Sequence, residues 1–120
     1  MGTNEQTMTW IKDTYMAVKG EQDINAEGCC TGKFLSQGGI AGRAESTGLG
    51  VYYAVRTLLN TPSFHERVKL TKGIKGKTFI VQGFGAVGYW ASKFIEQDGG
   101  KITTVIEYNS AIHNPAGLDV

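Results

Sequence analysis

The chain has 120 residues, of which 41% are hydrophobic and 19% are charged, and its formal net charge is +1. This balance is that of one ordinary globular domain, and it excludes a strongly basic surface of the kind that binds nucleic acid. The sequence holds no apolar run long enough to span a membrane and no charged start with an apolar centre that would mark a cleavable leader. We therefore expect neither a nucleic-acid nor a membrane partner.

The first 42 residues predict one helix and then a long loop. Apolar residues recur at helical spacing over residues 8–18, and Thr7 can cap that helix. Residues 23–42 contain so many glycines that they predict a loop crossing between layers. Within it, the adjacent Cys29 and Cys30 cannot easily bridge each other and match no metal spacing, which favours a reducing compartment.

The rest of the chain alternates helices and strands. Residues 45–59 resume a helical pattern, which Thr61 and Pro62 end. His65 and His113 stand alone in the sequence, so we predict no metal site. The remaining predicted elements are a short helix over residues 63–70, a turn over 72–77, a strand over 77–81, a helix over 86–97, a strand over 101–106 and a loop over 114–120.

Three glycines at GxGxxG spacing join the first predicted strand to the following helix. In such a turn Gly83 permits the sharp reversal, Gly85 leaves room for a pyrophosphate, and Gly88 lets helix and strand pack closely. The phosphates would meet free N–H groups at the positive end of the helix macrodipole. Glu107 follows the second strand, about 20 residues after the last glycine, where a ribose-binding carboxylate is expected. The pattern predicts a dinucleotide site; the alternative is a βαβ unit whose glycines serve packing alone.

The predicted fold class is α/β, with an incomplete Rossmann-type NAD(P)-binding domain of one βαβ unit preceded by helices. One such unit buries a single strand pair, whereas a doubly wound sheet has several parallel strands covered on both faces. We therefore expect these residues to be part of a longer protein. By themselves they are expected to fold poorly and to need partner chains.

Three longer stretches resemble the glutamate dehydrogenases, specifically the animal-type mitochondrial hexameric enzymes of the Glu/Leu/Phe/Val dehydrogenase superfamily. They read TGKFLSQGGIAGRAESTGLGVYYAV, KGKTFIVQGFGAVG and IHNPAGLD, over residues 31–55, 75–88 and 112–119. The resemblance implies oxidative deamination of L-glutamate to 2-oxoglutarate and ammonium with NAD or NADP. It also implies a homo-hexamer or a larger assembly in the mitochondrial matrix. Residues 1–41 would then end the substrate, or dimerisation, domain and cross over, and residues 42–120 would open the NAD(P)-binding domain.

The resemblance also assigns roles to individual residues. Arg43 corresponds to an arginine that helps to hold the amino-acid substrate, and a planar, always charged guanidinium suits a carboxylate. Thr47 corresponds to the threonine that hydrogen-bonds the nicotinamide carboxamide. Without the family match, Arg43 could be a solvated charge at a helix start and Thr47 a helix cap. The remaining cofactor-binding residues are Phe84, Gly85, Ala86 and Val87 in the pyrophosphate turn, Glu107 at the adenosine ribose, and Tyr108 beside it.

Several departures from the family pattern bear on activity. The family's catalytic lysine and aspartate have no counterpart here, so no catalytic residue is assigned and the chain alone is expected to be inactive. Ala86 replaces the usual asparagine of the turn, and Tyr108 puts a bulky ring beside the ribose. The resemblance does not support GTP inhibition, because four residues of that region differ: Ala41, Leu49, Lys93 and Phe94.

Two other kinds of protein fit the same sequence. One is a non-catalytic, dehydrogenase-like subunit retained for assembly inside a larger complex. The other is a small module that senses NAD without turning it over. The absent lysine and aspartate favour both over an active enzyme, whereas Arg43, Thr47 and Glu107 favour a working dehydrogenase. Glu107 also favours NAD over NADP, since its charge would repel a 2′-phosphate.

Overall fold

A computed structural model describes residues 2–120 of the chain. These residues form two compact units, the first ending at Arg43 and the second spanning Ala44–Val120. The division lies close to the predicted boundary between residues 41 and 42. That the first unit belongs to a substrate domain and the second to a cofactor domain stays a prediction.

The first unit begins with helix α1, Glu5–Lys19. The prediction that Thr7 caps this helix is wrong, because the helix starts earlier and Asn4 is its cap. The Asn4 side-chain oxygen accepts a hydrogen bond from the Thr7 N–H at 3.1 Å, and the Thr7 hydroxyl accepts one from the Asn4 N–H at 3.4 Å. This reciprocal pair satisfies two N–H groups that the first helical turn would otherwise leave unpaired.

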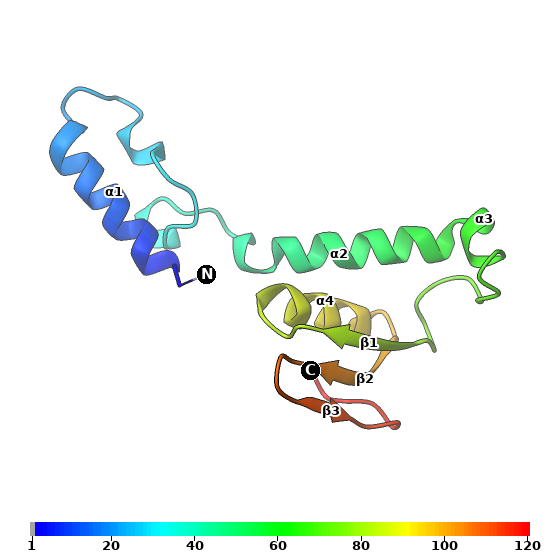
Figure 1. Ribbon diagram of the computed structural model, residues 1–120. Coiled ribbons are helices and arrows are strands. Elements are labelled where there is room, and N and C mark those ends of the chain that lie inside the picture. Colours follow the sequence, from blue (N-terminus) through cyan, green and yellow to red (C-terminus); the bar gives the residue numbers. More distant parts are fainter. Residues whose placement is uncertain (1) are drawn as a thin grey trace. The chain divides into compact units, whose positions relative to one another are not determined.

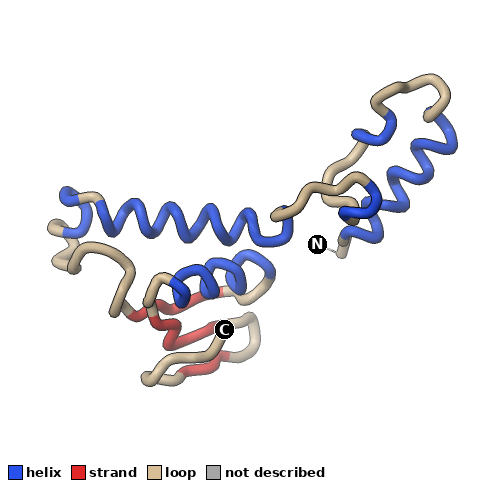
Figure 2. Tube along the Cα trace, turned by 180° about the vertical axis from the view of Figure 1, so that it is seen from behind, coloured by secondary structure: helices blue, strands red, loops and turns tan. Residues whose placement is uncertain are grey.

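The segment between α1 and α2 is mostly loop, as its glycines predict (Figure 2). Two short 3₁₀ helices interrupt it, η1 at Ala26–Gly28 and η2 at Leu35–Gln37. At Gly39 the loop backbone packs against the backbone of Lys33. Only glycine fits there, since a Cβ would lie 2.1 Å from the carbonyl oxygen of Lys33. The loop therefore has a defined path.

The second unit contains the remaining helices and all the strands of residues 2–120. The predicted helix over 86–97 and the predicted strand over 101–106 agree with the structure, whereas the predicted helix over 63–70 is only one turn long. The elements are α2 Arg43–Asn60, α3 Pro62–His65, β1 Thr78–Gln82, α4 Ala86–Gln97, β2 Lys101–Ile106 and β3 Ala111–His113.

The strands form one sheet in the order β1-β2-β3. β1 and β2 are parallel, with Phe79 opposite Ile102 and Val81 opposite Val105, and α4 connects them. This is the predicted βαβ unit, and the α/β class is confirmed. β3 was not predicted: it pairs antiparallel with β2, with Val105 opposite Ile112. Three residues are too few to show a strand period, so the pairing with the edge of β2 defines this element.

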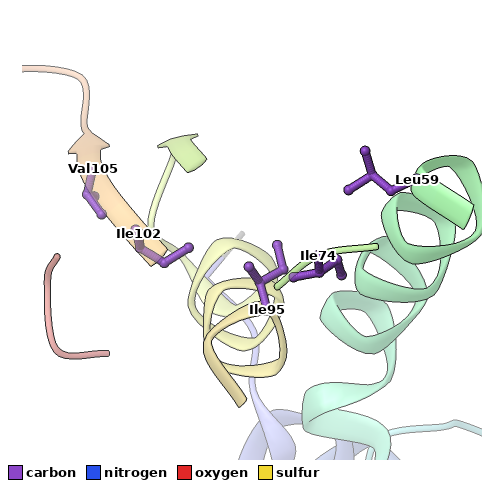
Figure 3. Packing of buried hydrophobic residues seen from close by; sticks show 5 residues of the cluster. All are labelled: Leu59, Ile74, Ile95, Ile102 and Val105. Atoms are coloured by element: carbon purple, nitrogen blue, oxygen red, sulfur yellow. The ribbon is translucent and has the colours of Figure 1, made fainter. Parts of the chain in front are cut away.

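Helix α4 lies between α2 and the sheet (Figure 1). The buried cluster combines Leu59 of α2, Ile95 of α4, and Ile102 of β2 (Figure 3), with Ile74 and Val105 completing it. Alternate residues of β1 are exposed, and Ile80 keeps 68% of its surface accessible. One face of the sheet is therefore covered by α4 and the other is open. Within residues 2–120, no helix combines the length and apolar character that crossing a bilayer requires.

Candidate functional site

The three glycines of the turn between β1 and α4 differ in conformation and in the space around them. Gly83 has φ +84°, a left-handed conformation that suits glycine. A Cβ at Gly85 would meet no atom within 4 Å, whereas one at Gly88 would lie 2.0 Å from the carbonyl oxygen of Gly83. The three glycines thus do different things: the first reverses the chain, the second leaves open space, and the third lets the backbone of the helix meet the turn.

Helix α4 presents its N-terminus at this turn. Gly85 is its N-cap, and no side chain makes a capping hydrogen bond there. The N–H groups of the first turn have no acceptor within the helix, and they lie at the positive end of its dipole. An anion bound beside Gly85 and Ala86 would therefore be stabilised without a cationic side chain.

Glu107 is brought to the same turn from the end of β2. Its carboxylate accepts a hydrogen bond from the N–H of Phe84, and the N–H of Gly83 donates to the carbonyl oxygen of Ile106 at 2.8 Å. These bonds hold the turn against the end of β2. A carboxylate has about four acceptor positions, so Glu107 can accept from ribose hydroxyls while it keeps its bond to Phe84.

The other turn residues differ in exposure. The Phe84 ring is half-buried and meets the Tyr89 ring edge-on, with centroids 6.0 Å apart. Ala86 and Val87 are exposed at the start of α4. Tyr108 is fully exposed, so its ring is free to lie beside a ribose held by Glu107.

Thr47 lies on the first turns of α2, exposed, next to a close helix–helix contact. A Cβ at Gly48 would lie 2.5 Å from Cβ of Trp90 and 2.8 Å from the backbone nitrogen of Ala91, so only glycine lets α2 approach α4 this closely. Gly48 therefore positions Thr47 relative to the helix that begins at the glycine turn. Sequence reasoning missed this role, although a glycine inside a helical run is the signal that could have found it.

Arg43 is the first residue of α2 and closes the first unit. Its guanidinium lies against Gly32, where an added Cβ would be 3.2 Å from the guanidinium carbon. Gly32 has φ +82°, which also suits glycine. The sequence alone does not connect Gly32 with Arg43, because the ten residues between them carry no pattern that predicts the contact. The structure thus brings Glu107 to Phe84 and places Thr47 next in sequence to the glycine that contacts α4, while the Arg43 guanidinium lies against the loop of its own unit.

Two ionisable groups on the helices of the second unit are perturbed. The hydrogen bond to the Tyr89 hydroxyl, at 3.1 Å, raises the pKa of Lys93. Burial, and then a hydrogen bond to Asp98 at 3.1 Å, raise the pKa of the Tyr52 hydroxyl. Lys93 is therefore charged and Tyr52 neutral at neutral pH, and both pairs fix side chains of α4 or of the turn that follows it. Within residues 2–120, no three His, Cys, Asp or Glu side chains gather as metal ligands.

Comparison with known proteins places these features in a family. The sequence model of the Glutamate/Leucine/Phenylalanine/Valine dehydrogenase family matches residues 38–120. The mitochondrial glutamate dehydrogenase of Dictyostelium discoideum is 50% identical over 120 residues, which are 100% of this chain and 24% of that enzyme. A probable glutamate dehydrogenase of Sinorhizobium fredii is 40% identical over 124 residues, covering 100% of this chain and 27% of the relative. The chain thus spans about a quarter of the length of these relatives.

Solved structures of similar fold are also glutamate dehydrogenases. The hetero-hexameric glutamate dehydrogenase of Thermus thermophilus, in a leucine-bound form, has a TM-score of 0.74 and 31% identity. The alignment covers 99% of this chain and 26% of that one. Since the family model matches well over half of the residues, the chain belongs to the Glutamate/Leucine/Phenylalanine/Valine dehydrogenase family.

Proposed function

We propose that the complete protein to which these residues belong is an NAD(P)-dependent glutamate dehydrogenase of the mitochondrial matrix. It would convert L-glutamate, water and oxidised cofactor to 2-oxoglutarate, ammonium, a proton and reduced cofactor. The observation that carries the proposal is the open glycine turn at the N-terminus of α4, with the Glu107 carboxylate hydrogen-bonded to Phe84. The mitochondrial enzyme of Dictyostelium discoideum supports both the activity and the compartment.

The residues of this chain would bind and orient rather than move protons. The N–H groups at the start of α4 would hold the pyrophosphate, and Glu107 the adenosine ribose. Thr47 would fix the nicotinamide ring, and Arg43 would hold a substrate carboxylate. The cofactor supplies the hydride acceptor when it is bound. These residues would contribute to the rate by holding the nicotinamide ring in the right orientation against the substrate. The catalytic lysine and aspartate are expected in other parts of the protein.

The test is glutamate-dependent formation of NADH or NADPH by the complete protein. We expect turnover with L-glutamate to exceed that with L-leucine, L-valine or L-phenylalanine. The 120-residue chain assayed alone is expected to give no signal above buffer, because positioning without proton transfer leaves most of the barrier in place. A complete protein that binds NAD yet does not oxidise glutamate would contradict the proposal, as would preferred turnover of an apolar amino acid.

A second candidate is a dehydrogenase-like subunit that assembles with different chains. It is favoured by the similarity to a dehydrogenase described as hetero-hexameric. Mass measurement of the purified assembly distinguishes the two: a homo-hexamer is expected for the first candidate, and two kinds of chain for the second.

Cofactor choice gives a prediction of its own: the complete protein favours NAD. Glu107 is exposed at the glycine turn, so its charge would face the 2′-phosphate of NADP. Coulomb repulsion of unit charges at 4 Å is about 1 kcal/mol in water and grows in a less polar site. We expect Glu107→Ser to improve NADP affinity relative to NAD by about tenfold, which corresponds to 1.4 kcal/mol.

Two further variants distinguish the effect of the Glu107 charge from the effects of side-chain size and of removing any exposed carboxylate. Glu107→Gln removes the charge and keeps the size, so it should recover most of the gain if repulsion is the cause. Glu66→Ser removes an exposed carboxylate that lies after α3, outside the turn, and should leave the ratio unchanged. Equal affinities for NAD and NADP in the unmodified protein, measured by titration calorimetry, would show that Glu107 does not select the cofactor.

A further inference from the structure

The adjacent cysteines of the first unit hold their sulfur atoms on the same side of the loop. Cys29 Sγ and Cys30 Sγ are 4.0 Å apart, with the first thiol directed at the second sulfur. The Cys30 thiol in turn donates to the carbonyl oxygen of Met8, at 3.2 Å. A disulfide would need the sulfurs at about 2 Å, so the pair is a reduced dithiol. The hydrogen-bonded chain from Cys29 to Met8 keeps both thiols oriented together.

The dithiol is accessible from outside the unit. Cys29 is exposed, and Cys30, although half-buried, lines a cavity of about 370 Å³. Thr31, Lys33 and Ile40 line the same cavity. A ligand that engages Cys29 therefore has space beside Cys30 for a substituent of its own.

The protonation state of the Cys29 thiol affects which reagents the two cysteines react with. Although Cys29 is exposed, partial loss of hydration around its sulfur raises the pKa of the thiol; its hydrogen bond to Cys30 adds to this, and the Lys33 ammonium opposes it. The thiolate is the nucleophile in alkylation and oxidation, so a raised pKa makes Cys29 slow toward reagents that attack one thiol. A reagent that bonds to both thiols has a further advantage, because its second bond forms within the same molecule at high effective concentration.

The number of ligands identifies the class of partner. Structural zinc takes four ligands, and within the described part of the chain no third His, Cys, Asp or Glu joins the two thiols. A monosubstituted trivalent arsenical needs only two sulfurs. We propose that Cys29 and Cys30 form a chelating dithiol site for trivalent organoarsenicals. The reacting species is the dihydroxy form R–As(OH)₂, which phenylarsine oxide becomes on adding one water. Two As–O and two S–H bonds break, two As–S and two O–H bonds form, and two waters leave, with no change of oxidation state.

The probe is phenylarsine oxide, added to the folded complete protein and followed by intact mass. We expect one phenylarsenic per chain, with loss of two thiol protons. We also expect both cysteines to be protected from a prolonged iodoacetamide treatment that alkylates both of them in the protein without the arsenical. A small dithiol added in excess should remove the adduct. Cys29→Ser and Cys30→Ser should each lose the stable adduct, and their thermal transitions serve to check that they fold.

Three results would contradict the proposal that Cys29 and Cys30 bind the arsenical together. One is the absence of an adduct in the folded protein when the urea-unfolded protein forms one, since the fold would then hide the pair. Another is an adduct that leaves either thiol open to iodoacetamide. The third is an undiminished adduct in either serine variant, which would place the arsenic elsewhere. Because mass and alkylation are measured without substrate, these outcomes do not depend on the proposed dehydrogenase activity.

Discussion

Gly88→Ala is expected to lower the free energy of unfolding by about 3 kcal/mol, at the upper end for overpacking. The added Cβ would lie 2.0 Å from the carbonyl oxygen of Gly83 and 3.4 Å from Cγ1 of Val81. The first contact is with backbone, so it cannot be relieved by a rotamer change. Moving the Gly83 carbonyl would disturb the hydrogen bond that the Gly83 N–H donates to the carbonyl oxygen of Ile106. It would also displace the N–H groups at the start of α4. NAD affinity should therefore fall at least about tenfold, or 1.4 kcal/mol.

Gly50→Ala is the matched control. Gly50 lies inside α2, and a Cβ there would meet no atom within 4 Å. Alanine favours a helix interior over glycine by about 1 kcal/mol, so this variant should be more stable than the parent. Hydrogen exchange of the α4 amides reports local stability even if the complete protein does not unfold in two states. Similar exchange in the Gly88→Ala variant and the parent would show that the close contact is not required.

The βαβ unit could be predicted because each of its parts has a local cause. The strand over residues 101–106 and the helix over 86–97 follow from apolar spacing, and the turn between β1 and α4 from its three glycines. The start of α1 could not be placed, because Asn4 and Thr7 are both good caps and the spacing alone does not choose between them. β3 depends on pairing with β2 rather than on its own three residues.

In the candidate site, too, the features with a local cause could be predicted and those that depend on tertiary contacts could not. The openness at Gly85 and the close packing at Gly88 are properties of the local motif, and the structure has both. The approach of Glu107 to Phe84 depends on the parallel pairing of β1 with β2, which the motif implies but does not contain. The contact of Gly48 with Trp90 depends on how α2 crosses α4, so a single-sequence pattern carries little information about it.

Arg43→Ala in the complete protein is expected to lower kcat/KM for glutamate about a thousandfold, while the Kd for NAD stays within about twofold. Arg43 is exposed in this structure, and we expect bound substrate to exclude water from it. Removing one partner of such a buried charge pair costs about 3–5 kcal/mol, since the other charge is left unpaired, and 1.4 kcal/mol is tenfold. The substrate carboxylate would be that unpaired charge. Arg43→Lys keeps the charge but loses the planar fork, so an intermediate loss is expected. Steady-state kinetics with glutamate, together with NAD titration, provide the measurement.

A purely structural role for Arg43 makes a different prediction. Its guanidinium lies against Gly32, so removing it could loosen the loop of the first unit without any contact to substrate. Arg56→Ala is the control for losing an arginine from α2, because Arg56 lies over the rings of Tyr52 and Tyr53, at 6.0 and 5.9 Å from their centroids. It should leave kcat/KM nearly unchanged. If Arg43→Ala lowers thermal stability but not the affinity for glutarate, a dicarboxylate without the amino group, then Arg43 supports the loop and does not hold the substrate.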